Sequence, residues 1–303
     1  MLATKFRTTS NSIIELPSPF ETTYGVIKLL EPADCDKEKL LERVRSSNYD
    51  KPFIIDDGDS RSLYFSLAYV QSAMCLDNPN GLEFAYTRKM MSFLFFLHQP
   101  RSILLLGLGG GSLAKYCHRH LSSADITVVE IDPDVLAFRD QFLIPPDDSR
   151  FRVLLGDAAQ YVRDRSESVD VIMMDAFDRH GFAPSVSSPN FYVDVRDALT
   201  RRGVMVANLV GEKAERINHL EMMRTAFDNN VIVLPVQDGG NYVAFAFRDS
   251  SFEPRWRWIN SQAKAMGSRY GLDFPKFASK LERSRKLGYL KRIMHQPEFF
   301  EGY

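Results

Sequence analysis

A glycine-rich turn followed by an acidic residue is the part of this sequence that most clearly could bind a ligand. The apolar residues 103–106 lead into a turn that contains Gly107, Gly109 and Gly110, and a second apolar run ends at Glu130. Glycine lets the backbone approach a ligand closely because no Cβ stands in the way. A carboxylate at the end of the second strand can accept hydrogen bonds from both hydroxyls of a ribose. These residues predict a nucleoside site.

The spacing of the glycines favours a nucleoside without phosphate over a dinucleotide. The run Gly-Leu-Gly-Gly-Gly at 107–111 departs from G-x-G-x-x-G, and no Lys-Ser or Lys-Thr follows it. A dinucleotide needs a helix N-terminus aimed at its pyrophosphate, whereas a sulfonium nucleoside needs close backbone approach and a ribose carboxylate. We therefore favour an S-adenosyl compound over NAD. The alternative is that the glycines only allow a helix to pack closely on a strand.

Three further carboxylates follow predicted strands, where ligands of doubly wound sheets bind. Asp157 could accept a hydrogen bond from the exocyclic amine of adenine, or it could cap a helix. Asp175 follows a strongly apolar run, and a desolvated carboxylate there costs free energy unless it is paired or used. It could orient an amine and take its proton. Asp178 could add charge for a cationic substrate, or it could be a turn residue.

Strands that alternate with helices predict an α/β fold with a mainly parallel sheet. We expect strands at residues 103–106, 126–131, 151–155, 169–174, 204–208, 231–236 and 242–247. We expect helices at residues 82–97, 113–120, 134–142, 158–163 and 190–199. The last two strands are close in sequence and predict an antiparallel edge hairpin. The pattern is typical of a methyltransferase-type Rossmann sheet.

The flanking segments predict two smaller units. Residues 1–80 read as a small β-rich N-terminal domain, with strands in 21–30, 51–56 and 61–71 and a short helix within 34–46. Residues 81–250 form the predicted Rossmann-like nucleoside-binding domain, and residues 251–303 a helical, basic C-terminal extension. We interpret its basic residues as a solvated helix face, with a dimer contact or a nucleic-acid contact as alternatives.

The composition excludes several classes of partner. The chain has 303 residues, a formal net charge of −1 and three cysteines. So small a net charge gives no overall field that would attract nucleic acid or a membrane. Few, scattered cysteines are typical of a reducing compartment. The first residues lack the apolar core of a signal peptide, and no apolar stretch is long enough to span a bilayer. We expect a cytoplasmic protein with no nucleic-acid or membrane partner.

Metal binding and serine nucleophiles are not expected either. The Cys-His-Arg-His sequence at 117–120 lies on a predicted helix, where adjacent residues do not share a face. No G-x-S-x-G sequence appears. The carboxylates at the ends of the strands therefore remain the candidates for chemistry.

Together these motifs resemble those of the spermidine synthase family, the polyamine aminopropyltransferases, over about residues 54–247. The matching segments are the turn at 107–112, Val129-Glu-Ile-Asp132, Gly156-Asp157, the loop that begins Asp175-Ala-Phe-Asp178, and the upstream Val70-Gln71 and Tyr86-Thr87. They are similar to the family's glycine turn, ribose motif, adenine motif, catalytic loop and substrate segments. The family also places a small β-rich domain ahead of a Rossmann domain.

The resemblance implies an activity and a role for each of these residues. The donor would be decarboxylated S-adenosylmethionine, used as a co-substrate without a tightly bound cofactor, and the acceptor a small-molecule amine. Glu130 would hold the ribose, Asp157 the adenine and Gln71 the thioether side of the nucleoside. Asp175 would be the general base, with Tyr86, Asp178 and Asp238 at the substrate. The resemblance also implies a homodimer.

The substrate end departs from the family more than the nucleoside end. Gly110 stands where the family has an aspartate that contacts the amino group of the donor, and Asp238-Gly-Gly-Asn241 replaces Tyr-Pro-Ser-Gly. An aspartate at position 110 would repel the carboxylate of intact S-adenosylmethionine, so its absence opens the site to that donor. Asp238 could instead supply the missing charge.

Three functions follow from these observations. We expect aminopropyl transfer to a di- or polyamine, because Asp175 and Asp178 are retained. The alternatives are methyl transfer from intact S-adenosylmethionine and a non-catalytic nucleoside-binding protein. If methyl transfer holds, Gly110→Asp should abolish binding of the intact donor.

Overall fold

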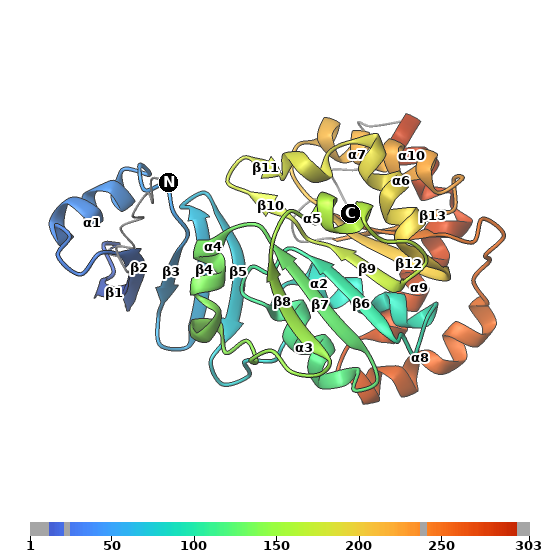
Figure 1. Ribbon diagram of the computed structural model, residues 1–303. Helices are drawn as coiled ribbons and strands as arrows, with labels where there is room; N and C mark the ends of the chain where they lie inside the picture. Colours follow the sequence, from blue (N-terminus) through green and yellow to red (C-terminus); the bar gives the residue numbers. More distant parts are fainter. Residues whose placement is uncertain (1–11, 21–24, 237–240, 296–303) are drawn as a thin grey trace, which may run out of the picture.

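A five-stranded antiparallel sheet forms the N-terminal part of the chain (Figure 1). The computed structural model describes residues 12–20, 25–236 and 241–295. The strands follow one another in the order β1 (Ser12–Pro17), β2 (Val26–Glu31), β3 (Phe53–Asp56), β4 (Ser60–Ser66) and β5 (Tyr69–Cys75). Helix α1 (Lys37–Arg45) connects β2 to β3, as the leucine spacing predicts.

The strand expected at residues 61–71 is wrong, because this segment is a hairpin. It contains all of β4 except its first residue, a two-residue turn at Leu67 and Ala68, and the start of β5. Two-residue hairpin turns usually carry Asn-Gly or Asp-Gly. Leu67-Ala68 contains none of these turn residues. The partial alternation of polar and apolar residues therefore gives no sign of a turn between the two strands.

The larger sheet has the strand order β13-β14-β12-β9-β6-β7-β8. Its strands are β6 (Ser102–Leu106), β7 (Asp125–Glu130), β8 (Phe151–Leu155), β9 (Val169–Met174), β12 (Leu199–Leu209), β13 (Val231–Pro235) and β14 (Tyr242–Phe247). All neighbours pair in parallel except β14, which is antiparallel to both β12 and β13. This confirms the methyltransferase-type Rossmann sheet. Within the predicted hairpin, β13 is the edge strand and β14 lies inside the sheet.

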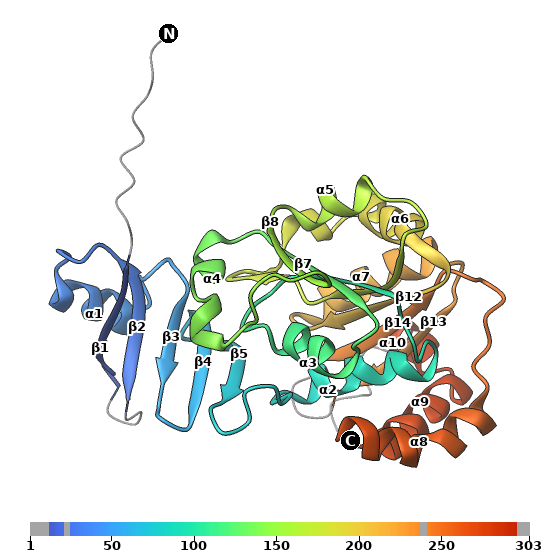
Figure 2. The same cartoon turned by 60° about the horizontal axis from the view of Figure 1, so that its bottom comes forward.

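Helices cover both faces of this sheet (Figure 2). One face carries α2 (Ala85–Met90), the 3-10 turn η1 (Met91–Phe95), α3 (Ser112–His120), α8 (Trp256–Tyr270) and α9 (Phe274–Lys286). The other carries α5 (Ala158–Arg163), α6 (Pro189–Ala198) and α7 (Lys213–Ala226). Successive strand residues point to opposite faces, so Leu105 packs in the first core and Leu104 in the second.

Two helical segments differ from the expectation. Residues 82–97 hold α2 and η1 rather than one helix, and residues 134–142 hold α4 (Pro133–Ala137) and the 3-10 turn η2 (Arg139–Phe142). Helix α7 is absent from the prediction, because its first turn is polar. Its buried residues lie in the second half, from His219 to Ala226.

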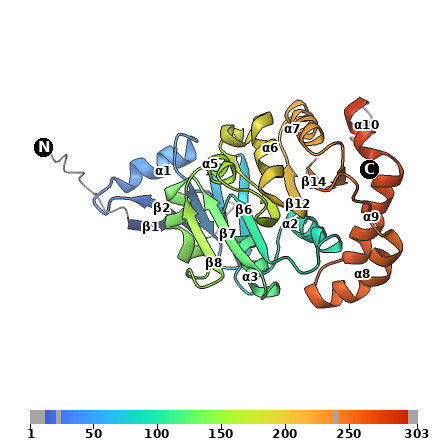
Figure 3. The same ribbon diagram turned by 45° about the vertical axis from the view of Figure 1, so that its right-hand side comes forward.

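The described residues of the C-terminal extension form helices and pass around the edge of the sheet (Figure 3). Helix α9 packs in the first core, whereas Ile293 of α10 (Tyr289–His295) is buried in the second. Both helices contact β13. The Ser284 hydroxyl of α9 donates a hydrogen bond to the Val233 carbonyl of β13. The extension is therefore part of the main fold.

The small sheet is fixed to the large one through η2. The Lys28 ammonium donates to the side-chain oxygen of Gln141 at 3.0 Å, and Arg61 donates to the Gln141 carbonyl. The Lys115 ammonium of α3 is buried between the two sheets and donates to the Phe142 carbonyl at 2.7 Å. These contacts join β2 and β4 of the small sheet, and α3 of the large domain, to η2.

None of the helices in the described part of the chain is long and apolar enough to cross a membrane.

Candidate active site

A cavity of about 640 Å³ lies at the carboxyl ends of β6, β7, β9 and β12. Strand β5 of the small sheet forms one wall. The hairpin of β10 (Phe177–Asp178) and β11 (Gly181–Phe182) forms another. Cavities of this size bind nucleosides and drug-sized ligands. Its position is the one expected for the ligand site of a doubly wound sheet.

Gly107 brings the glycine turn against the loop that begins at Asp175. Its φ is +95°, and a Cβ at this position would lie 2.3 Å from the Asp175 carbonyl oxygen. Both the backbone conformation and the contact exclude any side chain. The Asp175 amide donates to the Leu106 carbonyl at 3.0 Å, so the ends of β6 and β9 stay together. The predicted nucleoside turn and the predicted base therefore meet.

Glu130 links the glycine turn to the end of β7. Its carboxylate accepts hydrogen bonds from the Leu108 amide at 2.8 Å and from the Asp132 amide at 2.9 Å. Burial raises the pKa of Glu130, and these amide hydrogen bonds act in the opposite direction. The carboxylate lines the cavity, where each oxygen keeps a lone pair for a ribose hydroxyl.

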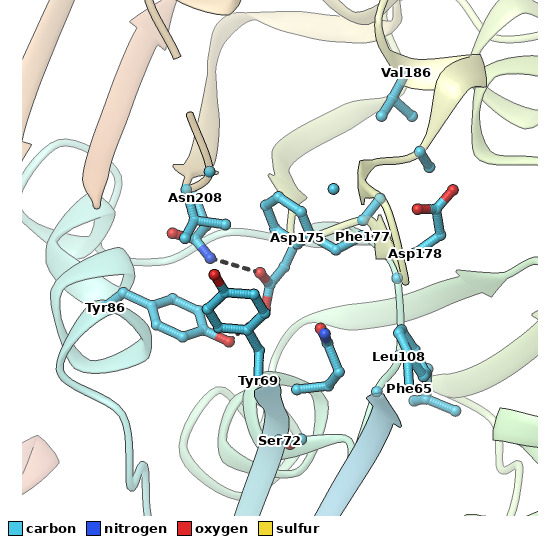
Figure 4. A pocket seen from close by; sticks show the side chains of 18 of the residues that line it. Phe65, Tyr69, Ser72, Tyr86, Leu108, Asp175, Phe177, Asp178, Val186 and Asn208 are labelled. Atoms are coloured by element: carbon cyan, nitrogen blue, oxygen red, sulfur yellow. Dashed lines mark hydrogen bonds between the residues drawn. The ribbon is translucent and has the colours of Figure 1, made fainter. Parts of the chain in front are cut away.

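Asp175 accepts one hydrogen bond on each of its oxygens, and Figure 4 shows the one that Asn208 donates. The Tyr86 hydroxyl lies 3.0 Å from Oδ2, and Nδ2 of Asn208 lies 2.9 Å from Oδ1. Burial raises the pKa of Asp175, while these two donors favour its charged form. Burial also raises the pKa of Tyr86, so its hydroxyl remains a donor. The two donors hold the carboxylate in a position from which it can accept a proton from an amine.

Gln71 and Asp178 also line the cavity, on different walls. Gln71 lies on β5. Asp178 lies on β10, and its carboxylate accepts a hydrogen bond from the His180 amide at 2.6 Å. Figure 4 shows Asp178 on the far side of Phe177 from Asp175. The two aspartates therefore face different parts of the cavity.

Asp157 is an N-cap in the structure, which is the second role that the sequence allows. Its Oδ1 accepts hydrogen bonds from the amides of Ala159 at 2.7 Å and Gln160 at 3.1 Å. Its neighbours Gly156 and Ala158 line the cavity. A contact between Asp157 and adenine stays a prediction.

Gly110 occupies a more crowded place than the sequence indicates. A Cβ there would lie 2.6 Å from the Ser72 hydroxyl and 2.9 Å from the buried Phe142 ring. An aspartate would displace that ring, so Gly110→Asp would test packing as much as donor charge. Gly109 lines the cavity, and a donor contact of Gly110 stays a prediction. Asp238 lies outside the described residues.

Several residues that line the cavity are not among the predicted site residues, and three of them are prominent. Asn208 bonds Asp175, Tyr69 is 75% exposed on β5, and Ile131 is 57% exposed beside Glu130. Asn208 is the last residue of the strand predicted at 204–208. A rule that selects amide as well as carboxylate side chains at the ends of strands would therefore have selected Asn208. The sequence does not show that an apolar residue such as Ile131 is exposed to the cavity.

Within the described part of the chain, no cluster of His, Cys, Asp and Glu could hold a metal ion. The sheet order, the glycine turn and the carboxylates at the strand ends define a methyltransferase-like Rossmann protein with a nucleoside-sized cavity. A buried carboxylate at the far end of that cavity gives it a group that can bind and deprotonate an amine.

Comparison with known proteins identifies the family. The spermine/spermidine synthase domain matches residues 83–232. A polyamine aminopropyltransferase of Chromobacterium violaceum is 33% identical over 77% of this chain and 90% of its own length. A probable spermidine synthase of Corynebacterium glutamicum has the same fold, with a TM-score of 0.60 and 21% identity, over 77% of this chain and 92% of its own. A spermidine synthase crystallised with the transition-state analogue AdoDATO has a TM-score of 0.59 and 17% identity. The match covers 80% of this chain and 84% of the other.

The chain belongs to the spermine/spermidine synthase family, which is a family of transferases. This confirms the resemblance stated from the sequence motifs.

Proposed function

We propose that this enzyme transfers the aminopropyl group of decarboxylated S-adenosylmethionine to a di- or polyamine, with Asp175 as the general base. The observation that carries the proposal is the Asp175 carboxylate. It lies in the cavity next to the glycine turn and accepts hydrogen bonds from Tyr86 and Asn208.

The nucleoside of the donor fits the end of the cavity at β6 and β7. Glu130 would accept hydrogen bonds from the ribose, Asp157 would face the adenine amine, and the exposed Ile131 would contact the adenine ring. Gln71 would lie along the thioether side. The related enzyme crystallised with AdoDATO supports a donor of this class.

The reaction needs a neutral amine. An alkylamine has a pKa near ~10.4, so at pH 7 only roughly one molecule in two thousand is unprotonated. Asp175 would take one proton from the ammonium. The nitrogen lone pair then forms a bond to the aminopropyl carbon next to the sulfonium, and the carbon–sulfur bond breaks. Sulfur keeps the electron pair and becomes a thioether, while the product amine carries the positive charge and Asp175 later releases its proton.

The acceptor end of the cavity suits a cationic amine. Asp175 and Asp178 present carboxylates from two walls, and Tyr86 and Tyr69 add hydroxyl and aromatic surface. Holding the amine nitrogen in line with the carbon–sulfur bond that breaks supplies much of the remaining rate enhancement. Asp178 can bind an ammonium group that does not react while Asp175 deprotonates the one that does.

Methyl transfer is the second candidate, because Gly110 leaves the donor end without the family's aspartate. Isothermal titration calorimetry with decarboxylated and intact S-adenosylmethionine separates the two. We expect clear preference for the decarboxylated donor, followed by turnover with diamines. Preference for the intact donor, without amine turnover, would refute aminopropyl transfer.

We further propose a cytoplasmic homodimer. The three cysteines are free, which suits a reducing compartment. Light scattering after size-exclusion chromatography measures the mass in solution, and a mass of one chain would contradict the dimer.

A further inference from the structure

Two asparagines connect the last strands of the sheet to Asp175. Asn208 lies near the end of β12 and is 2% exposed, and Asn241 lies directly before β14. Nδ2 of Asn208 donates to Oδ1 of Asp175 at 2.9 Å, and Nδ2 of Asn241 donates to Oδ1 of Asn208 at 3.3 Å. The antiparallel pairing of β12 with β14 places Asn208 opposite Val243, close to Asn241.

The direction of this chain of hydrogen bonds is fixed by chemistry. An ionised carboxylate can only accept, whereas a carboxamide has one end that donates and one that accepts. If the Asn208 amide were reversed, its oxygen would face the Asp175 carboxylate and its NH₂ group would face the NH₂ group of Asn241. The Asp175 carboxylate therefore sets the orientation of Asn208, and the Asn241 NH₂ group stabilises that orientation by donating to the Asn208 oxygen.

The Asp175 carboxylate is then held from two sides. Tyr86 of α2 donates to Oδ2 at 3.0 Å, and Asn208 of β12 donates to Oδ1. Two donors on two oxygens fix both the position and the plane of a carboxylate, and they leave its other lone pairs for an incoming ammonium. Each of these hydrogen bonds also favours the ionised form against the effect of burial.

We propose that Asn208 is a positioning residue for the general base, and that Asn241 acts through Asn208 by stabilising the orientation in which its amide donates to Asp175. This inference rests on the proposed function of Asp175. It adds two residues that lie outside the sequence motifs. Asn208 of β12 and Asn241 before β14 are then needed for Asp175 to act as the base.

The variants Asn208→Leu, Asn241→Ala and Asn241→Asp test this proposal, with Asn218→Ala on the exposed part of α7 as the control. Loss of a hydrogen bond to a charged group should lower kcat about 10- to 100-fold in Asn208→Leu and less in Asn241→Ala. Binding of the donor should stay within about threefold in each, because Asn208 contacts Asp175 and not the glycine turn.

The pH profile separates positioning from a structural role. In Asn208→Leu the acidic limb of kcat/KM should move to higher pH by about one unit, since a lost donor raises the pKa of Asp175. Asn241→Asp should be more impaired than Asn241→Ala, because a carboxylate at 241 attracts the Asn208 NH₂ group and turns its oxygen toward Asp175. The proposal would be overturned if the pH profiles of the variants coincided with that of the wild type, and if kcat fell only in variants with a lowered melting temperature.

A measurement without turnover separates this inference from the proposed function. A ¹³C NMR titration can follow the Asp175 carboxyl carbon, which is assigned by its loss in Asp175→Asn. We expect a higher pKa for Asp175 in Asn208→Leu and in Asn241→Ala than in the wild type and in Asn218→Ala. An unchanged pKa in both would refute the positioning role, even if the wild-type enzyme turned over amines. Absence of wild-type turnover would refute the proposed function alone.

Discussion

The Tyr86 hydroxyl donates a hydrogen bond to Oδ2 of Asp175 across 3.0 Å. The two residues come from α2 and from the loop after β9, so the contact exists only when the helix that enters the large domain is packed on the sheet. Burial raises the pKa of Tyr86, with the Asp175 charge as a second cause. The hydroxyl therefore keeps its proton throughout the working pH range.

Tyr86→Phe should lower kcat/KM about tenfold, because a hydrogen bond to a charged group contributes about 1.5–3 kcal/mol. The acidic limb of the pH profile should also move upward, since the lost donor stabilised the Asp175 carboxylate. Steady-state kinetics between pH 6 and 9 measure both effects. Tyr161→Phe on α5 is the control, and an unshifted acidic limb in Tyr86→Phe would contradict the contact's role.

Asp175→Asn should lower kcat by about 10²- to 10⁴-fold, the usual contribution of a general base. Donor affinity should change little, because Glu130 and the glycine turn are untouched. Single-turnover kinetics and donor calorimetry measure the two quantities separately. Asp178→Asn is the comparison, and it should raise KM for the amine more than it lowers kcat. Equal losses of kcat in both variants would contradict the assignment of the base.

Glu130→Gln should weaken donor binding about 10- to 100-fold, because charged hydrogen bonds to the ribose become neutral ones. The amide also presents an NH₂ group to either Leu108 or Asp132, both of which donate to Glu130 in the wild type. Calorimetry with the donor measures the loss, and Glu221→Gln on α7 is the control. If Glu130→Gln bound the donor with the dissociation constant of the wild type, Glu130 would only hold the glycine turn in place.

Lys115 should make stability depend on pH above neutrality. Burial lowers its pKa from 10.5 to about 8. Between these values the unfolded chain binds more protons than the folded one. The free energy of unfolding should therefore rise as the pH rises from 8 toward 10.5, and the full cost of the buried charge applies below 8.

Denaturant unfolding of the wild type and of Lys115→Met at several pH values between 7 and 10 tests this dependence. The difference between the two free energies should change with pH in this range. Lys264→Met, on the exposed face of α8, provides the control. Parallel curves for the wild type and Lys115→Met would show that the ammonium is solvated.

The parts of the site that the sequence predicts are those built from consecutive residues. Gly107 and Glu130 each follow an apolar run of a buried parallel strand, and such runs end where ligands bind. Asp175 is found by the same rule. Family resemblance supplied Gln71 and Tyr86, which no local pattern near the strands would have selected.

The parts that the sequence does not predict depend on contacts between distant segments. Position 208 could be assigned to a strand end, but its hydrogen bond to Asp175 requires the parallel pairing of β12 with β9. The crowding at Gly110 requires η2 to bring Phe142 against the turn. The family resemblance indicated only that an aspartate was missing from the turn, and it gave no sign that the space at position 110 was already filled.

The path of the C-terminal helices around β13 has a consequence for assembly. An open edge strand presents unpaired amides and carbonyls to which a strand of another molecule can add, and this is a common route to aggregation. Here α9 and α10 contact β13, and the Ser284 hydroxyl already occupies the Val233 carbonyl. The extension thus protects this edge from strand addition, so two molecules cannot join their sheets through β13 while these helices stay packed on it.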